Sequence, residues 1–340
     1  MSGSAQPLVS VLTPVYNGEK YLVECIESVL GQTFENWEYL IVNNCSTDST
    51  REIAEKYASR DPRIRVHNNE VFVKAIPNHN IAFRLISPDC KYVKVVHADD
   101  WLYPECIARM VALAEAHPSV GVVGSYSLEG DHVVWDGLPY SSAVVSGRDI
   151  CRWYLRGGPY IFGSPTSVLY RADLVRSRDP FYREQYPLWA DLDACLDLLR
   201  ESDFGFIHQV LSYTRRHDEA ASSVARRLNT YIFGQLEILK RYGPVYLEPS
   251  EYQERLRIHL REYHRFLGQG LFKRPGDREF WRYHTAGLRE LGVPITRAAL
   301  VRATIGAALE VVGYPLRAVR KVLAGSKGTS LRGLQNPMTR

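Results

Sequence analysis

Several features are scarce or missing in this 340-residue sequence, and each one excludes a class of protein. No uncharged run reaches the roughly 18 residues that a membrane-spanning helix needs. The N-terminus, MSGSAQP, has no charged segment followed by an apolar one, so we expect no secretory leader. The six cysteines include no CxxC pair and no metal-ligand spacing, which favours reduced thiols. We therefore expect a cytoplasmic protein, either free or peripheral at the inner face of the membrane.

Acidic residues are scarce in the C-terminal third. Residues 1–224 carry 21 Lys and Arg against 29 Asp and Glu, a net of −8, whereas residues 225–340 carry 21 against 9, a net of +12. The basic excess fits an anionic partner such as a membrane surface or a phosphorylated carrier. It fits equally a helical appendage with solvated arginines, or helices that pack on the rest of the chain or form a homodimer. Nothing in the sequence indicates nucleic-acid binding.

Apolar runs and helical periodicities alternate along the first part of the chain, which predicts parallel strands joined by right-handed crossovers. The pattern becomes helical and basic from about residue 225. We expect residues 1–224 to form one domain, with a nucleotide half at about 8–125 and an acceptor half at 126–224. Residues 225–325 are expected to be a basic helical region, in which 297–323 resembles an interfacial helix, and residues 326–340 a disordered tail.

Polar groups follow three of the predicted strands. They are Pro14 to Glu19 after the first strand, Asn43 to Asp48 after the second, and His97-Ala98-Asp99-Asp100 after a later one. Open α/β sheets bind ligands at this edge, and carboxylates there can share a hard divalent cation with substrate phosphates. Taken singly, the aspartates could also cap a helix, and the first motif could be a plain strand-to-helix turn.

The order of these motifs resembles family 2 glycosyltransferases, over roughly residues 8–220. The resemblance implies a GT-A fold: an α/β, Rossmann-like, mixed but mainly parallel sheet flanked by helices, here with a C-terminal helical extension. It also implies inverting, metal-dependent transfer of a hexosyl-type sugar from a nucleoside-diphosphate donor to an acceptor hydroxyl. The acceptor is expected to be a saccharide or a lipid-linked group of bacterial-type surface polysaccharide or glycolipid synthesis.

The resemblance places five residues around the nucleotide: Pro14, Tyr16, Asn17, Asn43 and His79. Tyr16 would stack on or flank the base. Asn43 stands where the family often has an aspartate that accepts from a uracil or thymine ring, so UDP and dTDP donors are favoured. An asparagine carbonyl can still accept that hydrogen bond. His79 stands where an arginine is common and would offer a weaker, pH-dependent positive charge; its alternative is a surface histidine.

The resemblance also assigns the charged end of the donor. Asp99 and Asp100 would hold Mg²⁺ or Mn²⁺, with Asp99 also close to the nucleotide sugar, while His97 replaces the first aspartate of the family's Asp-x-Asp-Asp. Arg216 and His217 resemble a basic closing loop, in which Arg216 neutralises the diphosphate and His217 is a further metal ligand. This loop could instead be a solvated surface turn.

The predicted general base is Asp191, in Trp189-Ala190-Asp191-Leu192-Asp193. The family motif is Glu-Asp-x-Asp before an apolar helix, and its second residue, which matches Asp191, accepts the proton of the incoming hydroxyl. Ala190 replaces the glutamate, and Asp193 is expected to be structural. A carboxylate at a helix start can also be a simple dipole partner.

The departures at positions 43, 79, 97 and 190 support an alternative from another class, a non-catalytic GT-A-like protein that binds nucleotide sugars or serves as a scaffold. A chain that had lost catalysis would be expected to lose its base and metal ligands as well. Because Asp99, Asp100 and Asp191 are all present, we favour the enzyme. A nucleotidyltransferase is disfavoured because the first motif is not a glycine-rich, basic phosphate loop.

Overall fold

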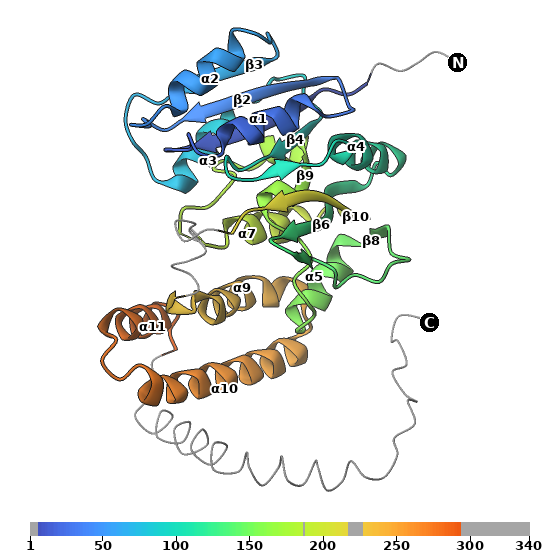
Figure 1. Ribbon diagram of the computed structural model, residues 1–340. Helices are drawn as coiled ribbons and strands as arrows, with labels where there is room; N and C mark the ends of the chain where they lie inside the picture. Colours follow the sequence, from blue (N-terminus) through green and yellow to red (C-terminus); the bar gives the residue numbers. More distant parts are fainter. Residues whose placement is uncertain (1–5, 186–187, 217–226, 294–340) are drawn as a thin grey trace, which may run out of the picture. The chain divides into compact units, whose positions relative to one another are not determined.

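The computed structural model describes residues 6–185, 188–216 and 227–293 (Figure 1). The chain divides into two compact units, Met1–Leu256 and Arg257–Arg340. The first unit therefore continues beyond residue 224, where the change in composition led us to place a domain boundary. That boundary, and the division into nucleotide and acceptor halves, remain predictions. The predicted helix at 297–323 and the predicted tail at 326–340 lie outside the described residues.

A single mixed sheet forms the centre of the first unit (Figure 1). Its main order is β3-β2-β1-β4-β9-β6-β10-β5, with β7 paired to β6 and β8 paired to β10. The strands are β1 (Val9–Val15), β2 (Trp37–Asn43), β3 (Ile64–Asn68), β4 (Tyr92–Val95), β5 (Trp101–Leu102), β6 (Val120–Glu129), β7 (His132–Val134), β8 (Val144–Val145), β9 (Val168–Arg171) and β10 (Asp203–Thr214).

The predicted parallel pairing is confirmed for β1 with β2, β2 with β3, β1 with β4, and β6 with β10. Strand β9 is antiparallel to both of its neighbours, β4 and β6. Because β9 runs in the opposite direction, its first residue lies at the edge where β4 and β6 end. The short 3₁₀ helix η1 (Pro165–Ser167), which precedes β9, therefore reaches the same edge as the predicted site residues.

Helices cover both faces of the sheet. In the first unit they are α1 (Leu22–Leu30), α2 (Thr50–Ala58), α3 (Ala75–Arg84), α4 (Cys106–Ala116), α5 (Gly147–Leu155), α6 (Ala172–Arg176), α7 (Ala190–Leu198) and α9 (Thr230–Tyr246). Buried residues of α1, α2 and α4 form one apolar core with the sheet, and those of α3, α5, α7 and α9 form the other.

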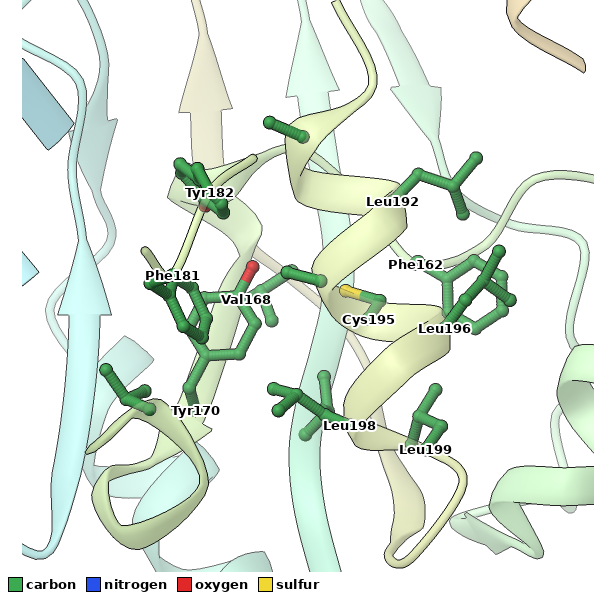
Figure 2. Packing of buried hydrophobic residues seen from close by; sticks show 14 of the residues in the cluster. Phe162, Val168, Tyr170, Phe181, Tyr182, Leu192, Cys195, Leu196, Leu198 and Leu199 are labelled. Atoms are coloured by element: carbon green, nitrogen blue, oxygen red, sulfur yellow. The ribbon is translucent and has the colours of Figure 1, made fainter. Parts of the chain in front are cut away.

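Helix α7 carries the predicted base and is anchored by the second core. In Figure 2, its Cys195 side chain points toward Tyr170, with Tyr182 on the same side, whereas Leu192 and Leu196 lie on the other side of the helix. All five residues are nearly or fully buried. Burial of this extent contributes roughly 1.5–3 kcal/mol for each large apolar side chain, so the helix is held firmly behind its polar first turn.

The second unit contains the larger part of α10 (Pro249–Lys273) and all of α11 (Arg278–Glu290). Its core is aromatic: the Tyr263 hydroxyl is 2.6 Å from Nδ1 of the buried His284, and Phe266 and Phe280 pack edge to face. Within the described part of the chain, no helix is both long and apolar enough to cross a membrane.

Candidate active site

The loops that follow β1 and β2 are joined by hydrogen bonds. Asn17 donates its N–H to the Ser46 hydroxyl at 3.0 Å and accepts from the Thr47 N–H through Oδ1 at 2.8 Å. The Gly18 N–H donates to the Thr50 hydroxyl at 2.7 Å. Asn17 has a φ of 50°, a left-handed conformation that asparagine adopts more readily than most residues. The two predicted nucleotide-binding loops therefore form one continuous rim.

Asn43 is buried at the end of β2, and its amide already has protein partners. Its Nδ2 donates to Oδ1 of Asn68 at 2.8 Å, while its Oδ1 accepts from the Ser46 N–H at 3.2 Å. An amide has two N–H groups and a carbonyl with two lone pairs, so one donor and one acceptor position remain. The predicted contact with a base stays compatible with this arrangement. The neighbouring Asn44 holds the Val73 N–H and carbonyl at 3.0 and 2.7 Å.

An exposed aromatic pair lies beside this rim. Pro14 is buried in β1 opposite Val42, and Tyr16, just beyond the strand, is 49% exposed. The Tyr16 ring meets Phe72 edge to face, with centroids 4.9 Å apart, and Phe72 is 58% exposed. Val71 beside it is also exposed. Exposed aromatic rings at a ligand edge offer a surface for stacking, so Phe72 joins Tyr16 as a candidate base contact.

The acidic motif after β4 is tightly held. Asp100 is buried, and its Oδ2 accepts from the Thr166 hydroxyl at 2.6 Å while its Oδ1 accepts from the Arg215 N–H at 3.0 Å. Burial, with a smaller effect of the Asp99 charge, raises the pKa of Asp100 to about 6. His97, Asp99 and Asp100 each offer a ligand atom, and these atoms lie within 4.8 Å of one another.

A buried lysine supports this motif from behind. Lys94, in β4, is fully buried, and its ammonium donates to the backbone carbonyls of Thr166 and, at 3.1 Å, Val168. The Thr166 hydroxyl in turn accepts from the His97 N–H at 3.2 Å. A buried ammonium is tolerated only when its hydrogens are bonded. Lys94 therefore fixes η1, and η1 fixes the acidic motif.

His79 and His97 face each other through their Nε2 atoms, which are 3.2 Å apart. The Nδ1 atom of His79 contacts the Ala75 carbonyl at 2.8 Å. Burial, together with the nearby His97, lowers the pKa of His79 to about 4. The imidazole of His79 is therefore neutral at pH 7, and the positive charge that we expected there is absent.

Asp191 opens α7, and its Oδ1 accepts the Leu192 N–H at 2.8 Å. Burial raises its pKa to about 6, and the His97 imidazole partly opposes this rise. After burial, the Asp191 charge is a cause of the raised pKa of Tyr160 and of Tyr182. The carboxylate thus lies within the electrostatic influence of two tyrosines, Tyr160 and Tyr182, and of His97.

Asp193 has a different environment, two residues further along the helix. It is fully buried, ion-paired with Arg178, with Arg183 at 3.0 Å and with Arg241 at 3.3 Å, and it accepts from the Tyr242 hydroxyl at 2.8 Å. These partners join α7 to α9 and to the segment after α6. The contacts support the structural role that we predicted for Asp193.

The predicted basic loop is described only in part. Arg216 is ion-paired with Glu129 at 2.8 Å, and His217 lies outside the described residues. Arg215 makes the contacts with the acidic motif: its Nε donates to the Asp99 carbonyl at 3.1 Å, and its guanidinium pairs with Glu24. The roles predicted for Arg216 and His217 remain predictions, and Arg215 is a positioning residue that we had not singled out.

The donor set after β4 fits a divalent cation. One imidazole and two carboxylates are close enough to share one ion, and this combination suits Mn²⁺ and similar divalent ions. The Asp100 oxygens keep lone pairs beyond those used by Thr166 and Arg215.

Three residues that support the site were not predicted from the sequence. Lys94 could have been noticed as a charge inside an apolar strand, and Phe72 as an aromatic residue in a polar loop. Thr166 had no such signal.

The glycosyl transferase family 2 model matches residues 10–178 of the chain. The putative glycosyltransferase EpsH of Bacillus subtilis is 34% identical over 75% of this chain and 73% of its own length. The putative teichuronic acid biosynthesis glycosyltransferase TuaG of the same organism is 41% identical, over 41% of this chain and 53% of its own length.

Two solved structures share the fold. Residues 1–349 of Staphylococcus aureus TarS, in complex with UDP-GlcNAc, align with a TM-score of 0.63 and 18% identity, covering 90% of this chain and 91% of that one. The mannosyltransferase PcManGT of Pyrobaculum calidifontis, in complex with GDP-Man and Mn²⁺, aligns with a TM-score of 0.54 and 15% identity, covering 91% and 81%. Both likenesses concern the fold alone.

Proposed function

Because the chain belongs to glycosyltransferase family 2, we propose that it transfers a hexosyl-type sugar, with inversion, from a nucleoside-diphosphate donor to an acceptor hydroxyl. The observation that carries this proposal is the placement of Asp191. Burial raises the pKa of its carboxylate to about 6, and His97, which belongs to the acidic motif at the end of β4, is among the groups that affect it electrostatically. This proximity supports the proposal that Asp191 acts as the base beside a diphosphate-binding motif.

The proposed chemistry is a single displacement. Asp191 accepts the proton of the acceptor hydroxyl while that oxygen forms a bond to the anomeric carbon. The bond between this carbon and the diphosphate oxygen breaks on the opposite side, and the nucleoside diphosphate leaves with the electron pair. Attack opposite to the leaving group inverts the anomeric configuration. A base whose pKa is close to the working pH combines a useful ionised fraction with a good driving force for proton transfer.

The donor end is assigned to the rim. Tyr16 and Phe72 would contact the base, Asn43 would hydrogen-bond its edge, and Pro14 and Asn17 would shape the loop around it. We favour UDP or dTDP donors, and the UDP-GlcNAc complex of TarS is consistent with this choice. PcManGT, in complex with GDP-Man, shows that the same fold also accepts a guanine nucleotide.

His97, Asp99 and Asp100 would hold a divalent cation, Mn²⁺ or Mg²⁺, and the Mn²⁺ of PcManGT supports this assignment. When bound, such an ion neutralises charge on the diphosphate. Arg216 is proposed to add positive charge near the diphosphate, and His217 to contribute a further ligand. Arg215 keeps the motif in place through its contacts with the Asp99 carbonyl and Asp100.

The acceptor is proposed to be a saccharide or a lipid-linked group of a surface polysaccharide. The name of TuaG, a putative teichuronic acid biosynthesis glycosyltransferase, is consistent with this assignment. The basic C-terminal region is proposed to touch an anionic membrane from the cytoplasmic side. On α10, Phe272 is 61% exposed and directly precedes Lys273 and Arg274. An apolar side chain beside basic ones is the pattern of an interfacial contact. The homodimer remains the competing arrangement for these helices.

The test is a panel of UDP, dTDP and GDP sugars, assayed for binding and slow hydrolysis with Mn²⁺, Mg²⁺ or EDTA. We expect metal-dependent turnover of one donor, lost in Asp99→Ala and in Asp191→Asn. His132→Ala, on the exposed β7 hairpin, is the control and should keep full turnover. Tight binding of one donor without turnover, even when saccharide acceptors are added, would instead favour the non-catalytic alternative. Folded protein that binds no donor would contradict the proposal.

A further inference from the structure

Position 97 is where this chain departs most from the family pattern, because an imidazole replaces the first carboxylate of the acidic motif. The structure places this imidazole in contact with two groups. Its Nε2 lies 3.2 Å from Nε2 of His79, and its Nδ1 lies 3.9 Å from Oδ2 of Asp100. The two ring nitrogens therefore face opposite ways, one toward a second histidine and the other toward the acidic motif.

The hydrogen bonds determine which nitrogen carries the proton. The Ala75 carbonyl can only accept, so Nδ1 of His79, at 2.8 Å, must be its donor. A neutral imidazole has one N–H, which leaves Nε2 of His79 as an acceptor. The group that donates to it is Nε2–H of His97. In a neutral His97, the proton on Nε2 leaves a lone pair on Nδ1, the atom that lies 3.9 Å from Oδ2 of Asp100.

This arrangement matches the way proteins prepare a histidine to bind a metal ion. A ligating histidine usually gives its other N–H to an acceptor, which fixes the ring and makes the free nitrogen more basic. His79 is the acceptor here, and the Ala75 carbonyl holds His79 in turn. Nδ1 of His97 lies 3.9 Å from Oδ2 of Asp100, and His97, Asp99 and Asp100 offer ligand atoms that lie within 4.8 Å of one another.

We propose that Nδ1 of His97 is a direct ligand of the divalent cation, that His79 orients it, and that the site consequently favours Mn²⁺ over Mg²⁺. This inference rests on the cation of the proposed function and adds a nitrogen to its ligands. Imidazole suits transition-metal ions, whereas Mg²⁺ prefers oxygen ligands and near-ideal octahedral geometry. An all-oxygen site would discriminate less between the two ions.

The test uses the full chain, stripped of metal and titrated with Mn²⁺ alone and with Mn²⁺ plus UDP. Pulsed electron paramagnetic resonance reports whether an imidazole nitrogen is bound to Mn²⁺, and competition with Mg²⁺ gives the ratio of the two dissociation constants. We expect nitrogen coupling in the parent protein and none in His97→Asp, with the preference for Mn²⁺ reduced roughly tenfold. His132→Asp, which adds the same carboxylate on the exposed β7, should change neither result.

The role of His79 is tested separately. His79→Leu removes the acceptor and should weaken Mn²⁺ binding about tenfold, whereas His79→Gln offers a carbonyl oxygen and should restore part of the affinity. Equal affinities in the two variants would overturn this part of the proposal. The pair also controls for folding, because both variants lose the same ring.

Two results would overturn the main proposal: Mn²⁺ bound without nitrogen coupling, or coupling that persists in His97→Asp and disappears in His217→Ala. The second result would assign the nitrogen ligand to His217 instead. Hydrolysis of nucleotide sugars in the same samples separates this inference from the proposed function. Metal-dependent turnover with an all-oxygen site would contradict the inference and support the proposed function. Nitrogen coupling without any turnover would support the inference and contradict the proposed function.

Discussion

The Thr166 hydroxyl donates a hydrogen bond to Oδ2 of Asp100 at 2.6 Å, although 66 residues separate them in the sequence. The oxygen of this Thr166 hydroxyl also accepts a hydrogen bond from the His97 N–H at 3.2 Å. One small hydroxyl thus fixes both ends of the four-residue acidic motif. Because Asp100 is buried, few waters could replace Thr166 as a partner, and the orientation of the carboxylate depends on this bond.

Thr166→Val keeps the shape of the side chain and removes the hydroxyl. We expect Mn²⁺ binding and kcat/KM to fall about 10- to 100-fold, as is usual when a partner of a metal ligand is lost. Thr166→Ser keeps the hydroxyl and should retain most of both. Thr33→Val is the matched control, because the Thr33 hydroxyl bonds the Pro104 carbonyl at the surface. Unchanged metal affinity in Thr166→Val would contradict the role assigned to this hydroxyl.

The pKa of Asp191, raised to about 6 chiefly by burial, predicts how activity depends on pH. Only the ionised carboxylate can accept a proton, so kcat/KM should decline about tenfold per pH unit below pH 6 and level off above it. Transfer rates measured from pH 4.5 to 8 at saturating metal check this. A flat profile across pH 6 would show that Asp191 is not the base.

The same raised pKa predicts that Asp191 destabilises the folded protein at neutral pH. The fold binds a proton at this carboxyl more tightly than the unfolded chain does, so its stabilising effect exists at low pH and is lost as pH rises through about 6. Asp191→Asn should therefore abolish transfer yet raise the free energy of unfolding by roughly 1–2 kcal/mol at pH 7.5. Near pH 4 the difference should vanish. Urea titrations at the two pH values measure it.

Asp193→Asn is the natural counterpart to that variant. Asp193 is fully buried among Arg178, Arg183 and Arg241. Removing its charge leaves the buried Arg178 guanidinium with Asp197, 3.6 Å away, in place of its buried partner, and the loss of a buried partner typically costs about 3–5 kcal/mol. We expect a large fall in stability at pH 7.5, opposite in sign to the effect at Asp191. Thermal unfolding of both variants at pH 7.5 measures the two changes in stability. A stabilised Asp193→Asn together with a destabilised Asp191→Asn would show that the roles of the two carboxylates are exchanged.

Phe72 is expected to contribute to donor binding. Phe72→Ala removes one ring of the exposed pair with Tyr16 and should raise the Kd of the preferred nucleoside diphosphate about 5- to 10-fold, a typical value for an aromatic contact. Binding of inorganic pyrophosphate should not change, because it has no base. Calorimetry with both ligands makes this comparison, and an equal loss for the two would point to a distorted loop.

Phe272 is expected to contact the membrane. Phe272→Glu replaces an exposed apolar side chain with a charge beside Lys273 and Arg274, and should reduce co-sedimentation with vesicles that contain anionic lipid several-fold. Tyr140→Glu changes another exposed aromatic residue, in the first unit, and serves as the control. If both variants sediment like the parent, Phe272 is not the contact.

Local patterns were sufficient to predict much of the sheet. The polar groups predicted to follow the first two strands do so: β1 ends at Val15 and β2 at Asn43. Strand ends could be predicted because apolar runs stop where polar residues begin. The acidic motif and Asp191 were found in the same way, with help from the family resemblance.

Long-range contacts could not be predicted from local patterns. The position of β9 between β4 and β6 depends on pairing across tens of residues, and an apolar run does not reveal its neighbours. Helix α5 was missed because it lies in a segment rich in charge, glycine and proline. Lys94 was likewise not singled out from the sequence, because a charge inside an apolar strand does not reveal that its ammonium holds η1.

Strand β9 pairs with β4 on one side and with β6 on the other. It therefore joins the part of the sheet that carries the predicted donor motifs to the part beside α7, which carries the predicted base. Under the proposed function, the two substrates would therefore bind to one continuous sheet and not to two lobes joined at a hinge. A hinge motion that separated the two parts of the sheet would break the hydrogen bonds between strands on at least one side of β9. We therefore expect a nucleotide-sugar donor to enter, and the nucleotide product to leave, through movements of the loops at the edge of the sheet.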